Sequence, residues 1–464
     1  MTIGVQISPQ DTAEQALDLA QKAGADGCVV LVDESAEANL RWANNTLTTN
    51  GVTHGSWTTV IATVGAGEGT AAGIVTRSAV TPDSLRDLVS AAVAAARSAD
   101  PAEDAQPLVE GAAGPDWEDE PGDTSVQVFE HFAPALGRAL KRADKQGRNL
   151  YGFADMQVTT TYLASSTGVR RRHEQPFGYV SMTGKSADLT KSAWVGRAMQ
   201  NFADFDVSTL DDDLVRRLGW SERTIDLPAG KYPTVLPPGA VADLMTYLYR
   251  TMDGRAAHEG HSAFSGKVGE QLSEQPVTLR SDPLYAGVQA PRFVISHWSG
   301  GPRSVFDNGM TLTPTTWINS GRLENLQTSR FTAGLTGLAV APPIGNYALE
   351  VEGATGTTDD LVAGLDDGLL LTCLWYIRMV DPQTLLVTGL TRDGVYRVEG
   401  GEVTGMVNNF RFNESPLDLL ARIDAGGACV PSFSREWGDE IPPLTATPPL
   451  LVPDFTMDSV SQAN

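Results

Sequence analysis

Runs of alternating apolar and polar residues, separated by turns rich in Asn and Gly, recur through most of the sequence. "GCVVLVDES" from Gly27 and "GSWTTVIATVG" from Gly55 are of this kind, and "LRWANNTLTTNG" lies between them. A period of two is typical of half-buried strands, and Asn and Gly suit tight turns. "GVYRVEGGEVTGMV" gives the clearest hairpin pattern, with Gly400 and Gly401 at its turn. These patterns predict a chain in which short, meandering strands dominate.

Helical patterns interrupt the strands at only a few places. Residues 8–24 combine early acids with an apolar stripe and a closing glycine. Further helices are predicted after Thr81-Pro82, after Pro237-Pro238 and after Ser415-Pro416. Another is predicted over residues 134–145, or from an earlier residue with a kink at Pro134. The glycine-rich "VGAGEGTAAG" precedes a strand-like segment, so it predicts a hairpin and not a phosphate-binding loop. Helices mixed with meandering strands are typical of an α+β fold.

The length of 464 residues predicts more than one domain, because single cores stop growing near about 250–300 residues. The pattern of strand and helix restarts between Ser221 and Pro228. We place a boundary there and predict a mixed α/β amino-terminal domain over residues 1–225. A β-rich carboxy-terminal domain is predicted over residues 226–464.

Composition limits the partners and the compartment. The formal net charge of −23 repels phosphate backbones and argues against direct nucleic-acid binding. It could attract a basic peptide or partner, although an acidic surface also simply favours solubility. No apolar run approaches the roughly 18–20 residues of a membrane span, and no secretory signal pattern is visible. Cys28, Cys373 and Cys429 form no disulfide framework, so a cytoplasmic location is predicted.

One short stretch has the composition of a zinc-protease site. "AAHEGHSAFSGKVGE" contains His258, Glu259 and His261. Zinc-binding HExxH motifs place two histidines at i and i+4 on a helix, whereas here the spacing is i and i+3 and glycines follow. The stretch therefore predicts a polar loop, and nothing in the sequence places His297 beside it as a third ligand. No GxSxG, SxxK or Walker motif occurs, so motifs alone predict no active site.

The most distinctive part of the sequence is residues 369–420, "LLLTCLWYIRMVDPQTLLVTGLTRDGVYRVEGGEVTGMVNNFRFNESPLDLL". This block closely resembles the carboxy-terminal domain of the TldD/PmbA family of metallopeptidases, historically also labelled modulators of DNA gyrase. "RWANNTLTTNG" from Arg41, "SVFDNG" from Ser304 and "MDSVSQA" from Met457 are similar to the same family. The resemblance covers nearly the whole chain.

The resemblance also implies which kind of subunit this is. The TldD kind carries a long helix with HExxxH, and a later cysteine completes its zinc site; the PmbA kind, also called TldE, lacks these ligands. Here the corresponding helix, residues 238–252, contains no His and no Glu and is expected to be apolar and packed. Cys373 is not the metal cysteine. The resemblance therefore implies a PmbA/TldE-type subunit with no catalytic residue, metal ligand or cofactor of its own, and with zinc in a TldD-like partner.

Resemblance to a PmbA/TldE-type subunit also implies a function. We expect a non-metal subunit of a TldD/TldE-type heteromer that acts on short or unfolded peptides and is inactive alone. One alternative is a subunit of a similar enzyme that trims or remodels peptides or amides in natural-product biosynthesis. A second is a free-standing interaction protein, as the gyrase-modulator label suggests.

Several polar residues in the resembling block are candidates to face a substrate or the partner. Arg378 follows "LWYI", Arg392 and Asp393 lie in the turn "GLTRDG", and Asn413 and Glu414 lie in "FNES". The alternative is structural, because Asn and Asp satisfy turn backbones and Ser415 caps a helix.

Overall fold

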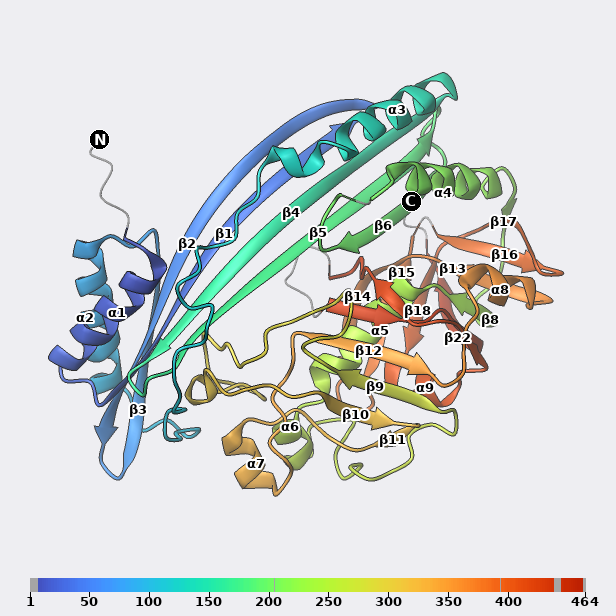
Figure 1. The fold of residues 1–464 in the computed structure, drawn as a ribbon. Helices are drawn as coiled ribbons and strands as arrows, with labels where there is room; N and C mark the ends of the chain where they lie inside the picture. Colours follow the sequence, from blue (N-terminus) through green and yellow to red (C-terminus); the bar gives the residue numbers. More distant parts are fainter. Residues whose placement is uncertain (1–6, 204, 393, 438–443, 462–464) are drawn as a thin grey trace.

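The computed structural model describes residues 7–203, 205–392, 394–437 and 444–461. Within these residues the chain has the predicted α+β fold, with helices and three β-sheets. One sheet arches over a body that contains the other two (Figure 1). All strands of the arch lie before residue 200, and all strands of the two body sheets lie after residue 223. Whether residues 1–225 and 226–464 behave as two separate domains stays a prediction.

The arch is an antiparallel sheet in the order β3-β2-β1-β4-β5-β6. Its strands are β1 (Gly27–Ala43), β2 (Thr46–Ala66), β3 (Gly69–Ser78), β4 (Arg148–Ser165), β5 (Arg170–Ser186) and β6 (Ser192–Met199). The prediction of three short strands over residues 27–65 is wrong in one respect. Asn44 and Asn45, with φ of 48° and 58°, form a two-residue turn inside the supposed middle strand, so only two long strands result.

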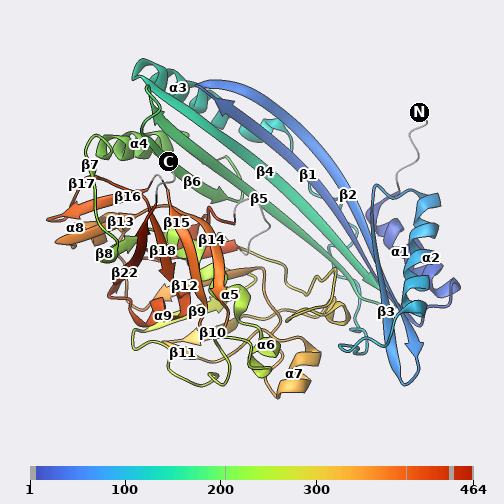
Figure 2. The same cartoon turned by 180° about the vertical axis from the view of Figure 1, so that it is seen from behind.

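Helices cover one face of the arch at both ends (Figures 1 and 2). They are α1 (Pro9–Lys22) and α2 (Pro82–Ser98) at one end, and α3 (Phe132–Lys145) and α4 (Val207–Trp220) at the other. Alternate residues of β1 supply the apolar contacts, with Val30 and Val32 under the first pair and Leu40 and Trp42 under the second. The remaining residues of β1 point to the opposite face, because successive side chains of a strand alternate.

That opposite face meets the body at two apolar contacts. Near one end, Val29 and Leu31 pack with Phe293 and Phe306 of the body. Near the other end, the ring of Phe433 stacks on Tyr179 of β5, with centroids 5.4 Å apart. Between these contacts the β1 residues of this face are polar, namely Asp33, Ser35, Glu37 and Asn39.

The body contains a six-stranded sheet and a larger sheet. The six-stranded order is β11-β10-β9-β12-β21-β20, and the main path of the larger sheet is β14-β15-β18-β22-β8-β13-β16-β17-β7, with β19 beside β22. The strands are β7 (Thr224–Ile225), β8 (Gly230–Leu236), β9 (Val277–Ser281), β10 (Thr315–Asn319), β11 (Arg322–Leu323), β12 (Asn346–Val351), β13 (Asp367–Leu371), β14 (Leu374–Asp381), β15 (Leu386–Thr391), β16 (Val395–Glu399), β17 (Glu402–Val407), β18 (Phe410–Glu414), β19 (Ala425–Gly426), β20 (Val430–Ser432), β21 (Leu444–Thr447) and β22 (Leu450–Val460).

Helix α5 (Pro238–Thr251) contributes to the main core of the body. Leu244 and Leu248 of α5 belong to one apolar cluster with Leu279 of the six-stranded sheet and Phe412 of the larger sheet. The shorter helices are α6 (Gly254–His258), α7 (Arg330–Thr336), α8 (Thr358–Ala363) and α9 (Pro416–Ala421). No helix in the described part of the chain is long and apolar enough to cross a membrane.

Two predicted local features of the body are confirmed. Gly400 and Gly401, with φ of 61° and 80°, connect β16 to β17 as a hairpin. Ser415 caps α9, and its side chain accepts a hydrogen bond from the backbone N–H of Asp418.

The contact of α2 with β3 provides a test of how closely the helix packs on the sheet of the arch. A Cβ atom on Gly73 would lie 2.1 Å from the carbonyl oxygen of Ala92 in α2. We expect Gly73→Val to push the helix off the sheet and to lower the free energy of unfolding by about 1–3 kcal/mol, as overpacking typically does. Thermal and urea unfolding measure this loss. Gly51→Val in β2 is the control, since a Cβ there meets nothing within 4 Å; equal stability of the two variants would contradict the expectation.

Candidate functional site

Helix α5 is buried against both sheets of the body and carries one buried carboxylate. Asp243 is 1% exposed, and its Oδ1 accepts hydrogen bonds from Ser434 Oγ at 2.6 Å and from the backbone N–H of Glu436 at 3.0 Å. The prediction that this helix is simply apolar is therefore wrong at one position. The available sequence signal was a single acid within an apolar helix, but its partners lie far along the chain.

The environment of Asp243 favours its protonated form. Burial raises the pKa of this carboxyl to about 7, although the bonds from Ser434 and Glu436 oppose the shift. The charge of Glu436 raises the pKa further, and Arg435 lowers it. Asp243 therefore titrates near neutral pH while enclosed by its own chain.

The partners of Asp243 belong to a crossing segment, residues 430–437, which runs from β20 across α5. Phe433 stacks on Tyr179 and on Trp194 of the arch. The Arg435 guanidinium lies over two indole rings, 4.8 Å from the centroid of Trp194 and 4.6 Å from that of Trp375. The crossing segment thus connects the arch, α5 and the larger sheet.

Glu436 holds the distorted start of β14. Its carboxylate accepts 2.8 Å hydrogen bonds from the backbone N–H groups of Tyr376 and Ile377. Tyr376 has a φ of 58°, a left-handed conformation that is uncommon for a bulky residue. Burial raises the pKa of Glu436, and the hydrogen bonds and Arg378 oppose that shift. Arg378, whose side chain is 60% exposed, pairs with Glu436 at 3.3 Å and lies over the Tyr376 ring.

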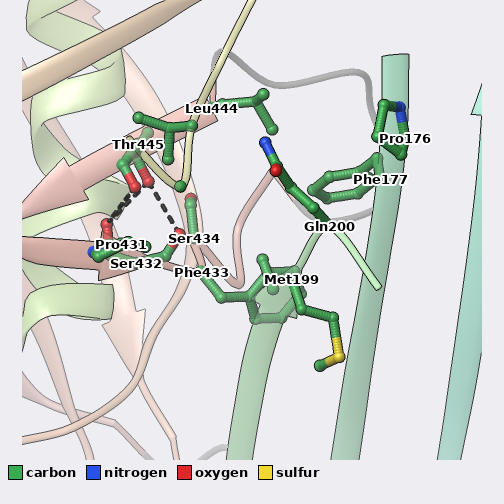
Figure 3. A pocket seen from close by; sticks show the side chains of 13 residues that line it. Pro176, Phe177, Met199, Gln200, Pro431, Ser432, Phe433, Ser434, Leu444 and Thr445 are labelled. Atoms are coloured by element: carbon green, nitrogen blue, oxygen red, sulfur yellow. Dashed lines mark hydrogen bonds between the residues drawn. The ribbon is translucent and has the colours of Figure 1, made fainter. Parts of the chain in front are cut away.

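A shallow pocket lies between the arch and the crossing segment, and its empty volume of about 450 Å³ includes open solvent. Phe177 and Gln200 from the arch side face Ser432 and Leu444 from the body side (Figure 3). Ser432 Oγ and Thr445 Oγ1 are hydrogen bonded at 2.8 Å on the body wall. The pocket combines aromatic and aliphatic surface with a few hydroxyl and amide groups, as small-ligand sites do.

The structure places two of the predicted polar residues on one face of the larger sheet. Arg378 of β14 and Asn413 of β18 lie on either side of Thr388 of β15, in one cross-strand row. Arg378 is exposed and Asn413 is half-buried. They could contact a bound molecule together, although their role stays a prediction.

Glu414 points away from that row because adjacent side chains alternate along a strand. It is buried, pairs with Arg422, and accepts a 2.6 Å hydrogen bond from the backbone N–H of Thr456. These internal contacts support the structural alternative for Glu414. Arg392 is exposed at the end of β15, and Asp393 lies outside the described residues.

The histidine stretch after α5 forms a short helix and a turn, and not a loop throughout. His258 ends α6, and Glu259 is engaged by Arg255 at 2.9 Å. His261 is exposed and lies 3.9 Å from Glu259. His297 does not join them, since its Nε2 lies 2.8 Å from Asp33 of the arch. Among the described residues, no three His, Cys, Asp or Glu side chains are grouped so that they could hold a metal ion.

The fold and the site define an α+β protein in which an arched sheet covers a two-sheet body built around a buried helix. The family model for the PmbA/TldA metallopeptidase C-terminal domain matches residues 229–459, and the chain belongs to the TldD/PmbA family. No curated protein matches the sequence.

Several solved structures share the whole fold. TldE from Thermococcus kodakarensis is 16% identical with a TM-score of 0.77, and covers 96% of this chain and 99% of its own. A putative modulator of DNA gyrase from Thermotoga maritima is 17% identical, with a TM-score of 0.76 and coverages of 96% and 99%. Another from Bacteroides thetaiotaomicron is 15% identical, with a TM-score of 0.76 and coverages of 96% and 98%.

The family is one of metallopeptidases, and the donors around α5 do not fit a zinc ion. Zinc in catalytic sites has about three protein ligands and an open position for water. Asp243 is the only carboxylate on α5, and its Oδ1 already accepts two hydrogen bonds. Glu436 is bound to backbone N–H groups, and the buried Cys373 thiol accepts a hydrogen bond from Arg435.

The raised pKa of Asp243 predicts that the free energy of unfolding depends on pH. Since the folded pKa of about 7 exceeds the unfolded value near 3.9, the folded state holds the extra proton between these pH values. The stabilisation is present below pH 4 and is lost as pH rises through 7. Relative to Asp243→Asn, the wild type should lose about 2 kcal/mol of unfolding free energy between pH 5.5 and pH 8. Urea titrations at both pH values test this.

The matched control is Asp458→Asn, which changes an exposed acid of β22. This variant should follow the wild-type pH dependence. Parallel curves for wild type and Asp243→Asn would contradict a neutral-range pKa for Asp243.

Proposed function

We propose that this chain is the metal-free, TldE-like subunit of a TldD/TldE-type peptidase complex that acts on short or unfolded peptides. The observation that carries the proposal is the state of α5. The helix keeps the family scaffold around it, yet its one acid is hydrogen bonded to the crossing segment. A TldD-like partner would supply the zinc and its hydrolytic chemistry.

In this proposal the chain contributes binding surface to the complex. The polar face of the arch is turned toward the body and the pocket lies between the two, so an extended peptide could be held there. Arg378 and the exposed Tyr376 at the edge strand β14 are candidates for contact with the peptide or the partner. The likeness to a solved TldE structure supports the assignment to this kind of subunit.

We also propose that the complex works in the cytoplasm. The three cysteines, all in the described part of the chain, form no disulfide with one another, and two of them are buried. Cysteines without disulfides suit a reducing compartment.

The proposal predicts that activity needs both subunits. The purified chain alone should hydrolyse no unstructured peptide and should hold far less than about one zinc per chain, since α5 offers too few ligands. Mixed with a TldD-like subunit, it should elute from gel filtration as a heteromer that cleaves the peptide. Size-exclusion chromatography, elemental analysis and a peptide cleavage assay make these measurements.

A TldD-like subunit with its zinc-binding histidines replaced by alanine is the matched control. It should still assemble with this chain but should produce no cleavage. Peptide hydrolysis by the isolated chain, persisting through further purification, would refute the proposed role, as would failure to assemble with every TldD-like subunit from the same genome.

A further inference from the structure

The polar face of the arch carries two neighbouring carboxylates from adjacent strands. Glu37 of β1 and Asp155 of β4 lie diagonally across the strand pair, because Asn39 is directly opposite Asp155. The Asn39 amide donates a 3.2 Å hydrogen bond to Glu37 Oε1. Tyr179 lies opposite Asp155 on its other side, in β5. The pair therefore lies on the part of the arch that faces the body.

Asp155 is buried, at 8% exposed, but its carboxylate is incompletely satisfied. Its Oδ1 atom is buried and accepts no hydrogen bond from a donor in the described chain. A buried carboxylate oxygen without a donor is costly, so such atoms are rare in folded proteins. Burial and the neighbouring Glu37 raise the pKa of Asp155 to about 7.

The other buried carboxylates of the described chain all have partners. Asp211 pairs with Arg148, Asp307 with Arg330, and Glu414 with Arg422. Asp243 accepts bonds from a hydroxyl and a backbone N–H group. Asp155 alone among them has neither an ion pair with Lys or Arg nor a hydrogen bond from a hydroxyl or N–H group of the described chain, and Glu37 is the group hydrogen bonded to it. In the free protein a proton shared with Glu37 offsets this charge, and a ligand that displaces the proton must be positively charged or carry N–H donors.

The surroundings of the pair indicate what such a partner looks like. Aromatic rings border the pair, since Phe153 and Phe177 both lie within about 6 Å of the Tyr179 ring. Phe177 also lines the pocket between arch and body, and it is a diagonal neighbour of Asp155, about 7–8 Å away. Rings beside a carboxylate pair suit an alkylammonium group, whose methylenes pack on the rings while its N–H groups meet the oxygens.

We infer that Glu37 and Asp155 form a subsite for a primary ammonium group of a peptide. The neighbouring residue of that peptide would lie in the pocket between arch and body, which Phe177 lines. The inference rests on the proposed peptide-binding role and narrows its substrates to those with a lysine side chain or a free amino terminus. The strongly acidic chain would also draw such peptides toward it.

Binding exchanges a proton for the ammonium group. In the free protein near pH 6, one proton is shared by the carboxyl pair. The ammonium group arrives protonated and the shared proton leaves to solvent, so about one proton is released per peptide bound. Affinity should fall about tenfold between pH 8 and pH 6, because the pair must ionise to bind.

Other titratable groups also face this region and contribute to the pH dependence of binding. They are Asp33 and Arg41 of β1, His173 and Tyr179 of β5, and, from the body, Arg292 near His173, His297 on Asp33 and Arg435 over Trp194. His173 would gain positive charge as the pH falls and would also repel a cation. The variants below separate its contribution from that of the carboxyl pair.

The test is isothermal titration calorimetry of the full chain alone, in chelator-containing buffer. The probes are a capped Ala-Lys-Phe-Ala tetrapeptide, its capped norleucine analogue, and the norleucine peptide with a free amino terminus. We expect the capped lysine peptide, the free-amine peptide, or both, to bind at least tenfold more tightly than the capped neutral peptide. The two charged peptides distinguish a lysine site from an amino-terminal site.

The variants Asp155→Asn and Glu37→Gln should each weaken that binding at least tenfold and should remove the proton release. Glu34→Gln is the matched control, since Glu34 lies on the opposite face of the same strand and pairs with Ser56. Equal binding of charged and neutral peptides, or equal effects of Glu34→Gln and Asp155→Asn, would overturn the inference.

If Asp155→Asn fails to fold, proton release by the wild-type chain in buffers of different ionisation enthalpy still decides the question. Binding without proton release at pH 6 would overturn the inference. Because no TldD-like partner is present, the result is separate from the proposed assembly. A chain that assembles and supports cleavage but binds no ammonium group would remove only this inference.

Discussion

The contact of Phe433 with Tyr179 and Trp194 joins one end of the arch to the body, beside the contact of Trp220 in α4 with Tyr396. The rings of the crossing segment pack on this end of the arch, and Val29 and Leu31 supply the contact at the other end. Because apolar contacts at both ends hold the arch on the body, the residues between them can be polar without separating the two parts.

The same crossing segment determines the chemistry of α5. Ser434 and Glu436 donate hydrogen bonds to Asp243, while the neighbouring Phe433 and Arg435 pack on the arch and on Trp375. Arg435 lowers the pKa of Asp243, while the buried charge of Glu436 raises it. The position of the arch and the ionisation of the central helix are therefore coupled through eight consecutive residues.

Local features of this fold could be predicted because their causes are local. The Gly400-Gly401 turn and the Ser415 cap depend on residues within a few positions of each other, and both are present. The turn at Asn44 and Asn45 was missed because Asn and Gly residues nearby offered competing turns. Asp243 and Asp155 could not be recognised, since the groups that define them lie on other strands or segments, up to 193 positions away. The candidate site consists mainly of such distant pairs.

Asp243 and Asp155 show that a similar pKa can arise from opposite arrangements. Both carboxyls titrate near pH 7 because burial penalises their charged form. Asp243 receives two hydrogen bonds from its own chain and holds the crossing segment on α5, so it needs nothing from outside. Asp155 faces Glu37 on a polar surface and keeps an oxygen without a donor. The first arrangement stabilises a junction, whereas in the second the carboxyl pair shares a proton until a bound ammonium group replaces it.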